Sequence, residues 1–194
     1  MDDAGPATDD VPVTTEQRPT TPATSATPAT PPVDGPPPWV LRLASLTIYV
    51  GVVGFVIAEI VQYAQSGTDG FLAATFANAL VWVVGVNAII CGSGHIVMPG
   101  PVAESIGWPK GSPFQFEVGL ANLGIGVLGV LSPSFDRDFA LAVVIAFSIF
   151  YFGAALGHVR EMISEHDTAP GNAGFIFWFD VIAPPALIAL YLAT

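Results

Sequence analysis

Four ionisable side chains lie inside, or at the ends of, apolar runs that are long enough to cross a membrane: His95, Glu117, His158 and Asp180. A charged group is costly in lipid, so such side chains usually face the protein interior and serve its function. Imidazole and carboxylate groups together can bind iron, zinc or manganese, and two facing imidazoles can bracket a haem. Intramembrane carboxylates can also relay protons. The four residues are therefore the first candidates for a site, including a metal site.

The composition of the chain predicts an integral membrane protein. Hydrophobic residues make up 52% of the 194 residues and charged residues only 11%, whereas a soluble domain carries about 25% charged residues. The formal net charge of −11 argues against nucleic acid as a partner, because nucleic acid selects a basic surface. The single cysteine, Cys91, excludes an intramolecular disulfide framework. A multi-pass protein of the cell membrane, with the lipid bilayer as its partner, is the class that remains.

The chain divides into a polar tail and an apolar domain. Residues 1–38 are acidic and rich in proline, threonine and alanine, which predicts a disordered tail. Residues 39–194 are expected to form an all-α membrane bundle of about five transmembrane helices, because a spanning helix needs about 20 mostly apolar residues. The expected spans are residues 39–63, 71–97, 114–131, 139–158 and 174–192.

The direction of each span gathers the ionisable groups at one face of the membrane. Loops of alternating length predict an up-and-down bundle, in which the second and fourth spans end, and the third and fifth begin, at the face that carries the tail. At about 1.5 Å per residue, the four ionisable residues fall within the outer turns of that face. We therefore expect a cluster of polar side chains there. Its further members are Gln115, Asn122, Arg160, Glu161 and Asn172.

The third span carries two different faces. Glu117 points about 160° away from Gln115 on a helical projection, together with Ala121 and Gly124. Both faces are expected to pack against protein, which would make this span the central helix of the bundle. The opposite face is a stripe of small and amide residues, a pattern that permits close helix approach and hydrogen bonds between helices. That stripe contains Gln115, Gly119, Asn122, Gly126 and Gly129.

Basic residues near the span ends predict the orientation of the protein in the membrane. Arg42, Lys110 and Arg160 fall on the side of the tail, whereas Arg137 falls on the other side between two aspartates. This bias predicts that the N-terminus lies inside the cell and the C-terminus outside.

Four sequence motifs follow one another between Cys91 and the end of the chain: GHIVMP, AESIGWPKGSPFQFEVGLANLGIGVLG, FGAALGHVREM and APGNAG. Together they resemble a family of uncharacterised bacterial integral membrane proteins, a domain of unknown function. The resemblance implies no activity, because none is assigned to that family. The positions that carry it are His95, Pro99, Trp108, Gln115, Glu117, Asn122, His158 and Asn172.

Three functions remain open, and the sequence assigns no catalytic residue. The first is a structural or accessory protein, acting with other membrane subunits or with itself. Its polar groups would pair between helices, as Glu117 with a histidine and Arg160 with Glu161 or Asp180. The second is a redox protein whose four ionisable residues hold a transition metal, or whose histidines hold a haem. The third is a proton-coupled small-molecule transporter in which Glu117 and Asp180 are the relay carboxylates.

Overall fold

The computed structural model describes residues 46–194, and its elements are helical. The expected tail, residues 1–38, and the beginning of the first expected span, residues 39–45, lie outside the described residues. The helical elements are the short 3-10 segments η1 (Thr47–Tyr49) and η3 (Ser132–Ser134), the π-helix η2 (Ala79–Val86), and the α-helices α2 (Val50–Ser66), α3 (Phe71–Asn78), α4 (Asn87–Val97), α5 (Pro99–Ile106), α6 (Phe114–Leu131), α7 (Arg137–Ser164), α8 (Pro170–Ala173) and α9 (Phe175–Ala193).

Four of the five expected spans are helices that are long and apolar enough to cross a membrane. Their bounds are Phe71–Val97, Phe114–Ser134, Arg137–Ser164 and Pro170–Ala193. The fourth helix begins at Arg137, two residues before its expected start. It ends at Ser164, because the polar residues that follow His158 continue the helix. Helix α2, with 17 residues, is apolar but shorter; it contains most of the described part of the first expected span and ends three residues beyond it. The all-α membrane fold class is therefore confirmed.

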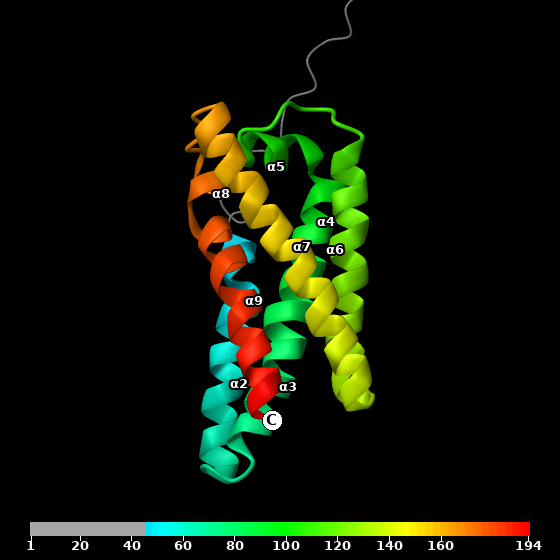
Figure 1. The fold of residues 1–194 in the computed structure, drawn as a ribbon, viewed down its shortest axis with the longest axis vertical. Coiled ribbons are helices and arrows are strands. Elements are labelled where there is room, and N and C mark those ends of the chain that lie inside the picture. The colour runs from blue at the N-terminus through cyan, green and yellow to red at the C-terminus, as the bar shows by residue number, and fades with distance from the viewer. Residues whose placement is uncertain (1–45) are drawn as a thin grey trace, which may run out of the picture. The chain divides into compact units, whose positions relative to one another are not determined.

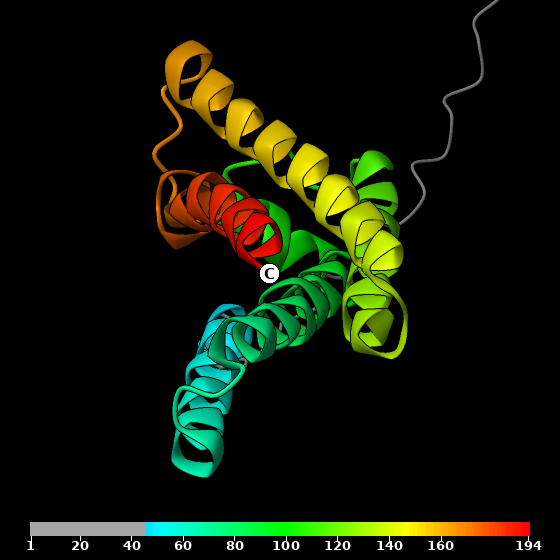
Figure 2. The same ribbon diagram turned by 60° about the horizontal axis from the view of Figure 1, so that its bottom comes forward.

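The helices pack in a connected series rather than around one central helix. Helix α6 packs on α4 and η2, α9 packs on α7 and α8, and α2 packs on η2. Helix α7 crosses one side of the bundle, and α2 lies on the opposite side (Figures 1 and 2). The buried apolar residues join η2, α7 and α9 and include Val84, Phe147 and Leu187.

Both connections at one end of the bundle contain a short helix. Helices α5 and α8 lie at the end where α6 begins and α7 ends (Figure 1), and α5 packs on both α4 and α8. Gly107 ends α5 with a φ of +83°, which glycine adopts without strain. A Cβ at Gly107 would also meet the carboxyl group of Asp167, so the loop after α7 lies directly against the end of α5.

The small-residue stripe of α6 packs closely on the second span, as expected. All five residues of the stripe are buried. A Cβ at Gly126 would lie 2.7 Å from the main-chain nitrogen of Ile89 and 2.8 Å from the carbonyl oxygen of Gly85. A Cβ at Gly92 would lie 2.6 Å from the carbonyl oxygen of Gly119. Glycines on both helices therefore bring the two backbones into contact.

The expectation that α6 is central is wrong, because its other face is not covered by the described residues. Glu117, Ala121 and Gly124 are all exposed, and a Cβ at Gly124 would meet no atom within 4 Å. Small residues on two faces permit two close neighbours but do not require them. With α4 and η2 on one side, α6 lies at the edge of the bundle (Figure 2).

Candidate functional site

A buried histidine and a buried aspartate meet between α7 and α9. The Nε2 atom of His158 lies 3.5 Å from the Oδ2 atom of Asp180, and the two residues are 8% and 2% exposed. On the other side of the ring, Nδ1 of His158 lies 2.6 Å from Oδ1 of Asn172, which is fully buried. One imidazole therefore contacts residues of two other helices, α8 and α9.

The loop between α7 and α8 holds Asn172 over the imidazole ring. Asp167 begins this turn: its Oδ1 accepts a hydrogen bond from the main-chain nitrogen of Ala169 at 2.9 Å. Pro170 is the first residue of α8, where its missing N–H leaves no hydrogen bond unmade. The Nδ2 atom of Asn172 donates to the carbonyl oxygen of Asp167 at 2.8 Å. Both ends of the asparagine amide are thereby fixed.

The side-chain amide of Asn172 fixes a proton on Nδ1 of His158. Because Nδ2 of Asn172 is used as a donor elsewhere, its Oδ1 faces the ring and accepts from Nδ1–H of His158. The lone pair of a neutral Nε2 would repel an ionised carboxylate. The contact with Asp180 is therefore attractive when one further proton is shared, either on Nε2 or on the carboxyl group. The His158–Asp180 pair can therefore bind and release one proton.

Aromatic rings and one more polar contact surround the pair on its inner side. The hydroxyl of Tyr151, about two helical turns before His158 on α7, donates to Oδ1 of Asn122 on α6 at 3.0 Å. The ring of Tyr151 stacks on Phe147 at 4.2 Å and lies 5.8 Å from Phe179 of α9, measured between ring centroids. The buried polar groups thus lie against an apolar, aromatic core.

Two other residues of the expected cluster lie nearer to α5. The Nε2 atom of Gln115, a buried residue of α6, donates to the carbonyl oxygen of Pro99 at 2.8 Å. The ring of His95, at the end of α4, lies 6.4 Å from the ring of Trp108, and its buried Nδ1 has no hydrogen-bond partner among residues 46–194. Gln115 therefore joins α6 to α5, and His95 lies beside Trp108 of the loop after α5; neither contacts the His158–Asp180 pair.

The ion pairs expected for Glu117 and Arg160 do not form within the described part of the chain. The side chains of Glu117 on α6 and Arg160 on α7 are exposed. The main-chain oxygens of Arg160 and Glu161 accept hydrogen bonds, but their side chains pair with no other described residue. Asp180, which was a possible partner of Arg160, pairs instead with His158. Helix direction brings residues to one face; the rotation of each helix decides which of them point inward.

The four candidate metal ligands do not converge in the described residues. No group of three or more His, Cys, Asp or Glu side chains within residues 46–194 is placed to hold a metal ion. Of the four, only His158 and Asp180 are in contact. Two ligands are fewer than the three or four protein ligands of a typical zinc site.

A further polar contact joins α2 to α3, and its residues were not among the members of the expected cluster. Both carboxylate oxygens of Glu59 accept hydrogen bonds, one from the hydroxyl of Thr75 at 2.7 Å and one from Nδ2 of Asn78 at 2.8 Å. The spacing of Thr75 and Asn78, three residues apart on one helical face, was the available signal.

The sequence profile of one protein family matches residues 44–194 of the chain. The chain belongs to DUF6790, a family of unknown function. The match covers the described bundle, including the polar contacts reported above. No curated protein and no solved structure matches the chain significantly. Membership in DUF6790 thus assigns no reaction, and the function must be argued from the geometry of the bundle.

Proposed function

We propose that the protein is a structural or accessory protein of the cell membrane, in which buried polar side chains lock neighbouring helices together. The observation that carries this proposal is the double contact of His158 with Asp180 and Asn172, which ties α7 to α9 and α8. The hydrogen bond between Tyr151 and Asn122 ties α7 to α6 in the same way.

Polar contacts of this kind suit a structural role, because lipid offers no competing hydrogen bonds. The apolar surfaces of two helices gain little from leaving lipid, so packing and interhelical hydrogen bonds decide which helices associate. The contacts of Glu59 with α3, Gln115 with α5 and His158 with α8 and α9 supply such specificity at several positions. The exposed charges of Glu117 and Arg160 would then be available to other membrane subunits or to a second copy.

The replacement Asp180→Asn tests this role. Asparagine keeps the size of the side chain and can donate to a neutral Nε2 of His158, but it cannot bind the shared proton. A structural role predicts that Asp180→Asn lowers the free energy of unfolding in detergent by less than removal of the whole polar contact does. Asp180→Leu, which removes the polar contact, serves as the matched comparison and should unfold at a lower denaturant concentration. Equal losses in both variants would contradict a role based on hydrogen bonding.

Proton-coupled transport is the second candidate, and the same pair supports it. A buried imidazole and carboxylate that share one proton are the kind of group that relays protons in membrane proteins. The test is proton uptake by liposomes that contain the purified protein. Transport predicts that Asp180→Asn abolishes uptake while the protein stays folded. Uptake that equals the wild type, or none in the wild type, would exclude this function for the pair.

We infer that the end of the bundle with α5 and α8 faces the cytoplasm. Lys110 and Arg160 support this orientation, because basic residues concentrate on the cytoplasmic side. In a Cys91→Ser background, Glu165→Cys and Ser134→Cys would place one thiol at each end. A membrane-impermeant maleimide added to intact cells should label the cysteine at position 134 and leave the one at position 165 unlabelled. The reverse pattern would invert the orientation.

A further inference from the structure

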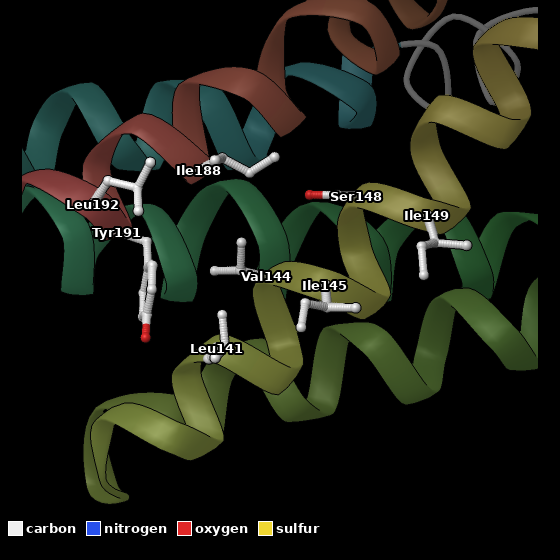
Figure 3. Close-up of a pocket in the computed structure, with 8 residues that line it drawn as sticks. All are labelled: Leu141, Val144, Ile145, Ser148, Ile149, Ile188, Tyr191 and Leu192. Atoms are coloured by element: carbon white, nitrogen blue, oxygen red, sulfur yellow. The ribbon is translucent and has the colours of Figure 1, made fainter.

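An apolar groove runs between α7 and α9 on the lipid-facing side of the bundle (Figure 3). Its volume of about 340 Å³ lies within the range of small-molecule sites, roughly 300–1,000 Å³. Val144 and Ser148 are buried and form the floor, whereas Ile149 and Leu192 on the rims are more than 70% exposed. The groove therefore opens sideways, toward the space that lipid occupies.

The groove reaches from one end of α7 to about the middle of the membrane. Leu141 lines it one helical turn after Arg137, the first residue of α7. Ser148, at the deep end, is 11 positions further than Arg137, about 16 Å along a helix. Half of a typical hydrocarbon core is about 15 Å. The lining from Leu141 to Ile149 covers about 12 Å along α7, so the groove lies within the depth of one leaflet.

A cation lies at the mouth of the groove. Arg137 donates from Nη2 to the carbonyl oxygen of Tyr191 at 2.6 Å, and its guanidinium lies 4.3 Å from the centroid of the Tyr191 ring. Tyr191 itself lines the groove. Arg137 is exposed, and its Nη1 atom also donates to the hydroxyl of Thr194 at 3.4 Å. A guanidinium has five N–H groups, so three of them remain for a ligand.

Two aspartates flank this cation, and both are exposed. Asp136 caps α7 by accepting a hydrogen bond from the main-chain nitrogen of Phe139, and Asp138 lies in the first turn of α7. Positive and negative charge therefore alternate at the mouth. A purely anionic headgroup would meet Arg137 favourably but both carboxylates unfavourably. A headgroup that carries a phosphate and an ammonium complements all three residues.

We propose that the groove binds one acyl chain of a zwitterionic phospholipid of the phosphoethanolamine class. The phosphate lies against Arg137, the ammonium group against Asp138, and the chain runs along Leu141 and Ile145 toward Ser148. A bilayer supplies this ligand at high concentration directly beside the opening. This site is separate from the His158–Asp180 pair and does not depend on the function proposed for that pair.

The hydroxyl of Ser148 distinguishes an acyl chain from other ligands. Ser148 is 8% exposed, and its Oγ has no hydrogen-bond partner among the described residues. In Figure 3 the oxygen points away from α7 toward the side of α9. A hydrocarbon chain offers no acceptor, so Ser148→Ala should leave lipid binding unchanged. A ligand that carries a carbonyl at this depth would instead lose affinity in Ser148→Ala.

The test measures lipid binding to the full-length, delipidated protein by native mass spectrometry. Phosphatidylethanolamine and phosphatidylglycerol with identical acyl chains are added in separate titrations. The wild type should bind phosphatidylethanolamine about five-fold more tightly, a factor in line with one charge contact near a lipid surface. Asp138→Asn should remove this preference. Equal binding of both lipids by the wild type would overturn the proposal for the headgroup.

Two tryptophan variants test the groove itself. Ile145→Trp fills the groove from its rim and should weaken binding of phosphatidylethanolamine about ten-fold. Ile163→Trp makes the same change at an exposed position of α7 that does not line the groove, and should bind as the wild type does. If Ile145→Trp leaves lipid binding intact, an acyl chain does not occupy the groove. If the wild type is a dimer and Ile145→Trp makes it a monomer, the occupant is a second copy of the chain instead. Thermal unfolding of each variant shows whether it is folded.

Discussion

The imidazole of His158 lies between two partners from different helices, with Asp180 of α9 at 3.5 Å on its Nε2 side and Asn172 of α8 at 2.6 Å on its Nδ1 side. The pair with Asp180 joins α7 and α9, the two long helices of the last third of the chain. Because Asn172 fixes the proton on Nδ1, the state of the pair depends on one shared proton. A contact of this kind can stabilise the bundle, bind a proton, or do both.

A double-mutant cycle at His158 and Asp180 is expected to show strong coupling. His158→Leu leaves a buried carboxyl group without its partner, and Asp180→Leu leaves a buried imidazole. Removal of one member of a buried pair costs about 3 kcal/mol or more, so each single variant should lower the free energy of unfolding. The double variant should lose clearly less than the sum, because no unpaired charge remains. Equilibrium unfolding in mixed micelles measures the three values; strict additivity would show that the contact contributes nothing.

Tyr151→Phe should destabilise the bundle moderately. The change removes the hydroxyl that donates to Oδ1 of Asn122 and leaves a buried acceptor unpaired. Hydrogen bonds between membrane helices contribute about 0.6 kcal/mol on average and about 1.7 kcal/mol at most, and the loss should fall in that range. Tyr63→Phe, at an exposed position of α2, is the matched control and should show no loss. The same unfolding assay compares the two.

Gly126→Ala and Gly124→Ala should have opposite effects on the same helix. A Cβ at Gly126 would press against the backbone of the second span, and overpacking of this kind costs about 1–3 kcal/mol. A Cβ at Gly124 meets open space, and alanine favours helix by up to about 1 kcal/mol over glycine. Thermal unfolding in detergent distinguishes the variants. Equal stabilities would mean that α6 does not pack on η2 and α4 through this stripe.

Glu104 is expected to titrate at lower pH than a free glutamate. The Nζ atom of Lys110 lies 2.7 Å from its carboxylate, and this hydrogen bond lowers the pKa of Glu104. The lowered pKa means that the contact is present above the ordinary pKa of glutamate and is lost as pH falls through the lowered value. Both side chains are largely exposed, so the effect on unfolding should be small. Carbon-13 NMR of the labelled carboxyl group should show the pKa rise in Lys110→Gln and stay unchanged in Arg160→Gln.

The length and apolarity of the spans could be predicted from the sequence, because these properties are local. Lipid requires about 20 apolar residues in each spanning helix, and the runs from Phe71 to Val97 and from Phe114 to Leu131 meet that requirement on their own. The close-packed face of α6 could also be predicted, since Gly119, Gly126 and Gly129 recur at helical spacing. The π-helix η2 carried no such signal, because it widens an eight-residue segment of an apolar helix without changing its composition.

The pairing of the polar residues was decided by the tertiary structure. Position along a helix determines the depth of a side chain, so His95, Glu117, His158 and Asp180 could be assigned to one end of the bundle. Which of them meet depends on the rotation of each helix about its axis, and that follows from the neighbour on which the helix packs. Helix α9 packs on α7 and turns Asp180 toward His158, whereas α6 packs on α4 and turns Glu117 outward. The sequence by itself thus determined the membrane class and the depth of each group, and only packing decided its partner.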